Sequence, residues 1–571
     1  MRTEHKEQVL SEVIGRIVER VVRGANHPLG PIPAYTPSMA QSGGGAPAAG
    51  ARRDSDAEQA ELVLLDTLYH ERQRLERDPG APSARRDRVF WEEISRALPR
   101  HAEAERLELT RRIVAHFAGE IIGHFSPTVY QLTTRVVPPA LSLLLHALSP
   151  RRLFSSFPEL QDLTSRLVIR GESEQLRGLR ARGTVVLAPT HLSNLDSLAV
   201  GWALHFLGLP PFTYGAGLNL FINPLTSFFM HHLGAYTVDR KKTAPLYKES
   251  LKEYATVTME LGYDNLFFPG GTRSRSGAVE RHLKLGLLGA GLRAYINNLK
   301  RGKDRPNIYV VPCTLNYQLV LEAETLIADY LAETGKSRFV ILDDEFSQPQ
   351  RIAEFLRNIM GLDSTIYLVV SRALDPFGNR VDDEGRSLDP AGRPIDIRRY
   401  VSINGSPEHF PARDEEYTRE LGREVAAAFA RDNLLMSTHL VAFCVFRMLV
   451  ADNPGVDLFR LLRTGGTTES FSMYQVEEAM IRVLDAVRQL ARAGAVRCDE
   501  RLAKSGAEQL ISNALRYFGT YHRRPVLERR GDRLYAVDRN LLYYYHNRAT
   551  GYGLEASAAT GVLAGSAKER S

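Results

Sequence analysis

The sequence predicts an α/β protein in which a central mixed sheet is flanked along the chain by helical regions. Residues 160–414 alternate short apolar runs with segments of helical periodicity, the pattern of an α/β domain. Residues 54–159 and 415–552 instead repeat apolar residues mainly at helical spacing. Polar, glycine-rich motifs follow the apolar runs of the central part, and an open α/β sheet usually has its ligand cleft at such strand ends.

The N-terminal part begins with a predicted helix over residues 1–23, where Val9 and Val13 belong to an apolar series at helical spacing. Residues 24–53 are rich in Pro, Gly, Ala and Ser, a composition typical of a flexible linker. The helical region 54–159 is expected to support the central domain.

Within residues 160–414, five apolar runs predict strands, at residues 185–187, 236–238, 265–268, 308–311 and 365–370. Residues 372–400 are dense in Asp, Gly, Arg and Pro. Their acidic spacing suggests a calcium loop, but the twelve-residue ligand pattern with its terminal glutamate is missing. A structured surface insertion is therefore the favoured interpretation.

The C-terminal part, residues 415–552, is predicted to be mostly helical, with a hairpin formed by residues 526–528 and 533–537. Residues 553–571 are mostly small, and we expect a disordered tail there.

The composition limits the possible functions. A chain of 571 residues is too long for one compact core, so two or three domains are expected. The net charge of +6 is a mild bias, and no zinc-finger spacing or aromatic-interleaved basic stripe indicates a nucleic-acid partner. Cys313, Cys444 and Cys498 lie far apart without metal spacing or a disulfide framework, which fits a reducing cytoplasm.

His191 and Asp196 follow the apolar run that ends at Pro189. On a continuous helix a separation of five residues would turn the two side chains about 140° apart, so their contact requires a bend in the chain. Ser193 and Asn194 supply turn and capping chemistry at this point. An imidazole oriented by a carboxylate is a general base suited to neutral pH, so the pair predicts activation of a hydroxyl.

A second motif, with the sequence Gly271-Thr272-Arg273-Ser274-Arg275, follows another strand-like run. Two guanidinium groups and several backbone amides suit phosphate oxygens, and glycine allows close approach of the backbone. Taken alone, the loop would favour a solvated basic turn. It is not a P-loop, because no Gly-Lys-Ser/Thr follows.

Two further stretches complete an ordered set: an apolar strand that leads to Arg240, and a strand that leads to Pro312. The four blocks resemble, in order, those of the glycerol-3-phosphate acyltransferase family, within the superfamily of phospholipid-synthesising acyltransferases. Resemblance to the large bacterial branch extends to residues 541–548 and covers about residues 110–548.

This resemblance implies acyl transfer from a thioester, on coenzyme A or acyl carrier protein, to the sn-1 hydroxyl of glycerol 3-phosphate. His191 would act as general base and Asp196 would orient it. Because a thioester is already activated, no enzyme nucleophile, cofactor or metal is implied. The phosphate-binding and cleft residues implied by the resemblance are Arg240, Lys241, Gly271, Thr272, Arg273, Ser274, Arg275 and Pro312.

The sequence departs from the family pattern at two positions. Gly270 stands where the third block usually carries a glutamate, and Gln318 stands where the large branch often has one after the tyrosine. Both changes remove a carboxylate, so other acceptors stay open, namely dihydroxyacetone phosphate or a lysophospholipid. A catalytically silent lipid-phosphate-binding membrane scaffold is the alternative from a different class, and retention of His191 and Asp196 argues against it.

We expect the protein on the cytoplasmic face of the cell membrane. Residues 1–7 lack the apolar core of a secretory signal, and no apolar run of about 18 residues indicates a spanning helix, so contact with lipid is expected to be peripheral. The candidate surfaces, each of which also reads as buried core, are residues 136–145, the cluster of Phe221, Phe228 and Phe229, and residues 440–446. His231 and His232 lack a third ligand at metal spacing and are expected to be structural or interfacial.

Overall fold

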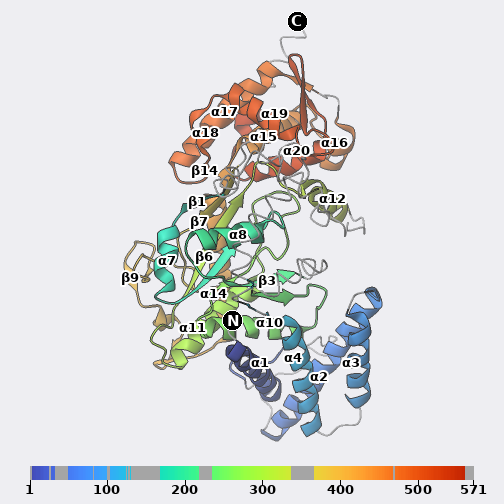
Figure 1. Ribbon diagram of the computed structural model, residues 1–571, viewed down its shortest axis with the longest axis vertical. Helices are drawn as coiled ribbons and strands as arrows, with labels where there is room; N and C mark the ends of the chain where they lie inside the picture. Colours follow the sequence, from blue (N-terminus) through green and yellow to red (C-terminus); the bar gives the residue numbers. More distant parts are fainter. Residues whose placement is uncertain are drawn as a thin grey trace, which may run out of the picture.

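The computed structural model describes residues 3–24, 27–32, 49–80, 83–98, 103–123, 125–126, 129, 167–217, 234–335, 351, 365–466 and 470–559. Three successive parts of the chain are stacked along the long axis of the molecule: N-terminal helices, an α/β part in the middle, and C-terminal helices (Figure 1). Residues 136–145, Phe221, Phe228, Phe229, His231 and His232 lie outside the described residues.

Within the described residues, the central sheet has seven strands in the order β1-β7-β6-β2-β5-β3-β4. β6 and β7 pair antiparallel and all other neighbours pair parallel, so the predicted mixed sheet is confirmed. The strands are β1 (Leu167–Gly171), β2 (Thr184–Pro189), β3 (Thr213–Gly217), β4 (Ala235–Val238), β5 (Asn265–Leu266), β6 (Ile308–Asn316) and β7 (Ile366–Val370).

Helices cover both faces of this sheet. Because side chains alternate along each strand, successive residues of β2 pack against helices on opposite faces. Val185 and Leu187 of β2 belong to the core shared with α7 and α8, whereas Val186 and Ala188 belong to the core shared with α10, α11 and α14. The helices are α7 (Ser173–Arg180), α8 (Asp196–Phe206), α10 (Pro245–Glu260), α11 (Leu285–Lys300) and α14 (Pro411–Asp432).

Pro312 does not end a strand, as the sequence led us to expect, but lies inside β6. A central strand tolerates proline where the ladder is interrupted. Val310 faces Leu374 whereas Cys313 faces Val370, so three steps along β6 correspond to four on its partner. This is a bulge whose extra residue lies on the partner segment, and Pro312 lies opposite it, where its missing N–H breaks no regular pair with β7.

Buried ion pairs join the N-terminal helices to α10. Arg16 lies 2.8 Å from Glu253 and 2.6 Å from Glu260, and Arg20 lies 2.5 Å from Glu249. All three glutamates are buried. The N-terminal helices are α1 (Thr3–Arg23), α2 (Ala49–Arg77), α3 (Ala84–Ala97) and α4 (Glu103–Ile121).

The expected linker at residues 24–53 is described only in part. Residues 27–32 lie against α1, where Arg20 donates hydrogen bonds to the carbonyls of Leu29 and Gly30 at 3.1 and 2.8 Å. α2 begins at Ala49, inside the expected linker. Residues 33–48 lie outside the described part of the chain.

The C-terminal part is built around α15, whose residues 440–446 are almost completely buried. This segment is therefore core, and its interpretation as a membrane surface is wrong. The predicted hairpin is present as β15 and β16, and α21 occupies positions where we expected disorder. Besides α12 (Ala323–Thr334), the elements are β12 (Leu434–Leu435), α15 (Ser437–Ala451), α16 (Leu458–Thr464), β13 (Ser470–Ser472), α17 (Met473–Arg492), β14 (Arg497–Cys498), α18 (Glu500–Lys504), α19 (Ala507–Phe518), β15 (Leu527–Arg530), β16 (Arg533–Ala536), α20 (Arg539–His546), η8 (Asn547–Ala549) and α21 (Glu555–Ala559).

Residues 372–400 form three successive turns, each with an aspartate followed three positions later by glycine. The aspartates, Asp375, Asp382 and Asp389, are seven positions apart and accept hydrogen bonds from backbone N–H groups of their own turns. Because these carboxylates serve the turns, the segment is the structured insertion that we favoured over a calcium loop. Its short elements are β8 (Ser387–Leu388), β9 (Pro394–Ile395) and η7 (Ile397–Tyr400), followed by β10 (Ser402–Ile403) and β11 (Ser406–Pro407).

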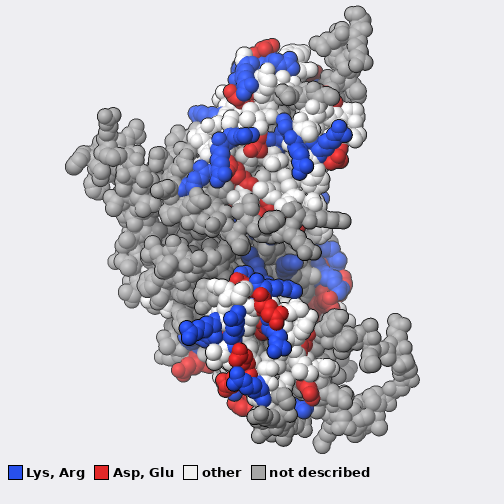
Figure 2. Space-filling model, turned by 90° about the vertical axis from the view of Figure 1, so that its right-hand side faces the viewer, with Lys and Arg blue, Asp and Glu red and all other residues white. Residues whose placement is uncertain are grey.

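No helix in the described part of the chain is long and apolar enough to span a membrane. On the face shown in Figure 2, lysines and arginines are intermixed with acidic side chains over both the N-terminal and the C-terminal parts.

Candidate active site

His191 and Asp196 meet because the chain bends between β2 and α8. β2 ends at Pro189 and α8 begins at Asp196, with the turn in between. His191 Nδ1 lies 2.9 Å from Asp196 Oδ2, so the contact that required a bend is formed. Asp196 therefore fixes the ring orientation, and Nε2 is the nitrogen left to face a substrate.

The Asp196 carboxylate is fully buried and well bonded. Its Oδ2 accepts hydrogen bonds from the backbone N–H groups of Leu192 and Ser193 at 2.6 and 2.9 Å. Its Oδ1 accepts a hydrogen bond from the Tyr317 hydroxyl at 2.6 Å. Such bonds offset the cost of burying a charge.

The His191 ring is held on its flat side as well. It stacks on Phe268 with 4.1 Å between ring centroids and 22° between planes. Burial lowers the pKa of His191 below its ordinary 6.5, although the hydrogen bond to Asp196 opposes the shift. The imidazole is therefore neutral at pH 7, as a general base must be.

The basic loop is attached directly to this pair. The Ser274 N–H donates a hydrogen bond to the His191 carbonyl at 2.7 Å. Gly271 has φ +76°, a left-handed conformation that favours glycine. Thr272, Arg273 and Arg275 line a cavity of about 710 Å³ beside the loop.

Arg240 lies close enough to Arg273 and Arg275 for their charges to act on it. Burial lowers the pKa of Arg240, and the two other arginines lower it further. Among the described residues, no carboxylate forms an ion pair with Arg240. Lys241, which we expected beside it at the phosphate, instead pairs with Asp78 after α2 at 2.5 Å. Arg275 lies 2.5 Å from Glu333 and Arg273 lies 3.4 Å from Glu322, so Arg240 is the arginine of this group without an ion pair among the described residues. The three guanidinium groups are suited to an anion.

Glu322 was not anticipated from the sequence, yet it joins the two motif loops. Its carboxylate accepts hydrogen bonds from Ser193 Oγ at 2.7 Å and from the Asn194 N–H at 3.0 Å. It also lies 3.4 Å from Arg273. Gln318 is occupied elsewhere, since its Oε1 accepts a hydrogen bond from Thr438 Oγ1 at the start of α15.

The C-terminal part closes the site from the other side. Asn547 Nδ2 donates a hydrogen bond to the Ser276 carbonyl at 2.9 Å. Arg548 is buried and donates to the Leu315 carbonyl at 3.0 Å, while its Nε and Nη1 have no hydrogen-bond partner among the described residues. The Tyr544 hydroxyl is likewise buried without a partner in the described structure. Polar atoms of this kind are suited to a bound substrate or water.

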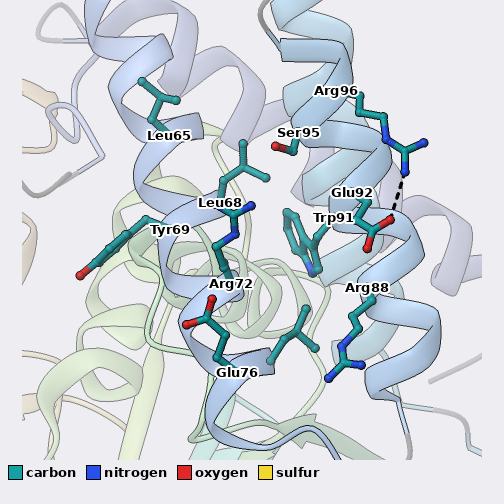
Figure 3. Close-up of a pocket in the computed structure, with 11 residues that line it drawn as sticks. Leu65, Leu68, Tyr69, Arg72, Glu76, Arg88, Trp91, Glu92, Ser95 and Arg96 are labelled. Carbon is teal, nitrogen blue, oxygen red and sulfur yellow. Dashed lines mark hydrogen bonds and ion pairs between the residues drawn. The ribbon is translucent and has the colours of Figure 1, made fainter.

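A second hollow, of about 810 Å³, lies between α2 and α3 and contains none of the predicted site residues (Figure 3). Trp91 forms part of it, and Arg96 pairs with Glu92 beside it. It is lined by apolar side chains and by charged side chains of both signs, without an acid–base pair like that of His191 and Asp196.

Asp87, His116 and Glu120 are the one group of potential metal ligands among the described residues. Arg74 already lies 2.7 Å from Asp87, and Lys242 lies 2.5 Å from Glu120. With both carboxylates paired to cations, the group is a partly buried charge network.

Comparison with known proteins matches the part of the chain that carries the motif loops. Residues 170–316 match the family model described as Acyltransferase. The chain carries an acyltransferase domain. The match begins in β1 and ends with β6, so it includes both motif loops and Arg240.

Curated relatives named glycerol-3-phosphate acyltransferase match the same domain. The chain is 35% identical to that of Aeromonas hydrophila over 155 residues, which is 27% of this chain and 18% of the relative. It is 30% identical to that of Pseudomonas syringae over 188 residues (30% and 22%) and 31% identical to that of Pseudoalteromonas translucida over 170 residues (29% and 20%). The chain thus covers about a fifth of the length of these relatives.

Proposed function

We propose that the protein transfers an acyl group from an acyl thioester to the sn-1 hydroxyl of glycerol 3-phosphate, giving lysophosphatidate in the first step of phospholipid synthesis. The observation that carries the proposal is one continuous arrangement: the His191–Asp196 pair is hydrogen-bonded through Ser274 to the loop of Arg273 and Arg275. A base for a hydroxyl therefore stands next to a group suited to a phosphate. The names of the curated relatives support this choice of acceptor.

In the proposed reaction the acceptor hydroxyl oxygen attacks the thioester carbonyl carbon, and His191 Nε2 takes the hydroxyl proton. The tetrahedral intermediate then expels the thiolate, which receives that proton from His191. The new C–O bond replaces the C–S bond, and His191 returns to its neutral form. Because the thioester is already activated, the reaction calls for no resident metal or redox cofactor.

Arg273, Arg275 and Arg240 would bind the acceptor phosphate and so fix the distance from phosphate to hydroxyl. This converts binding energy remote from the reaction into placement of the reacting oxygen. Glu322 supports the role because it attaches Arg273 to the turn that carries His191. Pro312 would contribute to the wall of the cleft only through the bulge in β6, since it is buried inside the sheet.

The donor would be acyl-coenzyme A or acyl carrier protein, and the site of action would be the cytoplasmic face of the membrane, reached by peripheral contact. A product with one long acyl chain partitions into lipid, which supports that location. Salt at high concentration should then release part of the protein from vesicles, since charges are screened beyond about 10 Å at 0.1 M salt.

The test is an assay of purified protein with liposomes and radiolabelled glycerol 3-phosphate, with acyl-coenzyme A and then acyl carrier protein as donor. Formation of labelled lysophosphatidate is expected, and acylation at sn-1 is checked by positional analysis of the product. Parallel reactions with dihydroxyacetone phosphate and with a lysophospholipid compare acceptors by kcat/KM. No product with any acceptor from a correctly folded protein would reject the proposal.

A further inference from the structure

Gly270 is the glycine of the basic loop that replaces the glutamate expected in this block. Its backbone is not in the left-handed region, unlike that of Gly271 at φ +76°. Backbone conformation therefore permits a side chain at position 270. A side chain there would require the Glu280 carboxyl group to move: a β-carbon at position 270 would lie 2.7 Å from Glu280 Cδ, 2.7 Å from Oε1 and 2.8 Å from Oε2. The carboxyl group of Glu280 thus fills the space next to Gly270.

Glu280 reaches this place from the far side of the loop and contacts the general base. Its Oε1 accepts a hydrogen bond from the His191 N–H at 3.0 Å. Its Oε2 is buried and has no hydrogen-bond partner among the described residues. The residue lines the same cavity as Arg273 and Arg275. One oxygen is therefore used to hold His191, and the other is left beside the proposed phosphate site.

We propose that Glu280 supplies, from ten positions further along the chain, the carboxyl group that Gly270 lacks, with Oε1 positioning His191 and Oε2 exchanging a hydrogen bond with a hydroxyl of a polyol phosphate acceptor. The role rests on the proposed acyl transfer. It explains how a site without the glutamate of the third block retains a carboxyl group, and why glycine is required at position 270 once Glu280 occupies that space.

The protonation of Glu280 fits a contact with a hydroxyl. Burial raises the pKa of Glu280 to about 8, while the His191 N–H and Arg548 act to lower it and Asp196 acts to raise it. At pH 7 the carboxyl is mostly protonated, so it both donates and accepts hydrogen bonds. Above pH 8 it ionises, and a negative charge next to a bound phosphate weakens acceptor binding.

The first experiment tests, without any assay of activity, whether the Glu280 carboxyl group occupies the space beside Gly270. Gly270→Ala should lower Tm by about 2–4 °C in the wild-type background, because the new methyl group overlaps the Glu280 carboxyl. In the Glu280→Ala background the same change should lower Tm much less, since the space is vacant. Gly201→Ala is the matched control, because a β-carbon there has no atom within 4 Å. If the effects of Gly270→Ala and Glu280→Ala on Tm were additive, the Glu280 carboxyl group would not fill the space beside Gly270.

The second experiment measures the functional role in the full-length protein. Glu280→Ala should raise the KM for glycerol 3-phosphate at least tenfold and leave the KM for the thioester nearly unchanged. Adding Gly270→Glu to Glu280→Ala should restore much of the lost kcat/KM at pH 7, and Gly270→Gln should restore a similar share, because a neutral amide also donates and accepts hydrogen bonds. Glu324→Ala, which removes another glutamate, at the start of α12, is the control for loss of a glutamate elsewhere. No recovery with either residue at position 270 would reject the role.

The pH dependence separates this role from a purely structural one. In the wild type the KM for glycerol 3-phosphate should rise as the pH increases through 8. In Glu280→Gln that rise should disappear, and an identical rise in both proteins would contradict the assignment. If the wild type transfers no acyl group, the proposed function fails, and the Tm experiment still decides whether Glu280 occupies the space beside Gly270.

Discussion

Tyr317 donates a hydrogen bond to Asp196 Oδ1 over 2.6 Å, from the end of β6 to the start of α8. This contact spans 121 positions of the sequence and gives the carboxylate of the His–Asp pair its bond on the side away from His191. The orientation of the proposed base therefore depends on β6 as well as on the turn that carries it.

Tyr317→Phe should lower kcat about tenfold and destabilise the protein by about 1.5–3 kcal/mol, because a buried charged group loses one hydrogen bond. Steady-state kinetics and chemical denaturation measure the two effects. Tyr521→Phe is the control, since it removes another buried hydroxyl, bonded to the Leu321 carbonyl. Unchanged kcat in Tyr317→Phe would show that this bond does not orient the base.

His191→Ala should reduce kcat by about 10²–10⁴-fold while leaving the far-UV circular dichroism close to wild type, since proton transfer is lost. Its Tm should fall, because the buried Asp196 carboxylate loses its bond to the ring and Phe268 loses its stacking partner. Asp196→Asn should retain more activity. His205→Ala, which changes an exposed histidine of α8, is the matched control. Wild-type turnover in folded His191→Ala would exclude His191 as the base.

The acid limb of the kcat/KM profile should lie below pH 6.5. His191 works in its neutral form, so activity falls as the pH decreases through its pKa, which burial has lowered. Asp196→Asn should move this limb to still lower pH, because the Asp196 carboxylate acts to raise the pKa of His191. A limb above pH 6.5 in the wild type would contradict the predicted environment of the ring.

Arg240→Ala should raise the KM for glycerol 3-phosphate at least tenfold. The change removes, from the three arginines proposed to bind the phosphate, a cation that has no acidic partner in the described structure. The neighbouring Lys241→Ala removes the same charge but only breaks the pair with Asp78, so its acceptor KM should stay unchanged. Arg273→Lys should recover only part of the loss seen in Arg273→Ala, because lysine lacks the planar fork. If Lys241→Ala raises the acceptor KM more than Arg240→Ala does, the phosphate-binding role must be assigned to Lys241 in place of Arg240.

The attachment of α1 to α10 should fail in acid. Burial alone would raise the pKa of Glu249, but Arg293, Lys252 and Arg20 lower it to about 2. A carboxyl whose pKa is lowered by folding stabilises the folded state above its ordinary pKa of 4.5, and that stability is lost as the pH falls toward 2. Hydrogen exchange of α1 should therefore accelerate between pH 4.5 and 2, and Arg20→Met should reduce this pH dependence.

Contacts between site residues that are close in the sequence could be predicted from it, whereas contacts between distant residues could not. His191 and Asp196 are five positions apart, so turn chemistry alone predicted their contact. Glu322 reaches the same turn from 129 positions away, and Glu280 from 89. A glutamate in a helix-forming or loop segment carries no local sign of such a contact, since the sheet topology brings it there.

Five strands of the central sheet were predicted from apolar runs, and β1 and β3 were missed, β1 although its first three residues are apolar. β2 and β6 gave clear apolar runs, whereas β3 contains two glycines in five residues and gave none. Pro312 was read as a strand end because the fourth block of the family that the chain resembles is a strand ending in proline. The bulge in the pairing of β6 could not be inferred from that strand alone, because the extra residue lies on its partner.

Arg240 and Lys242 are two positions apart and serve different parts of the molecule. Lys242 is buried beside Glu120 of α4, whereas Arg240 lies close enough to Arg273 and Arg275 for their charges to lower its pKa. A backbone segment this short transmits displacement almost completely, so the N-terminal helices cannot move away from the sheet without shifting Arg240. Deletion or displacement of those helices would consequently weaken binding of the anionic substrate before it changed the position of His191.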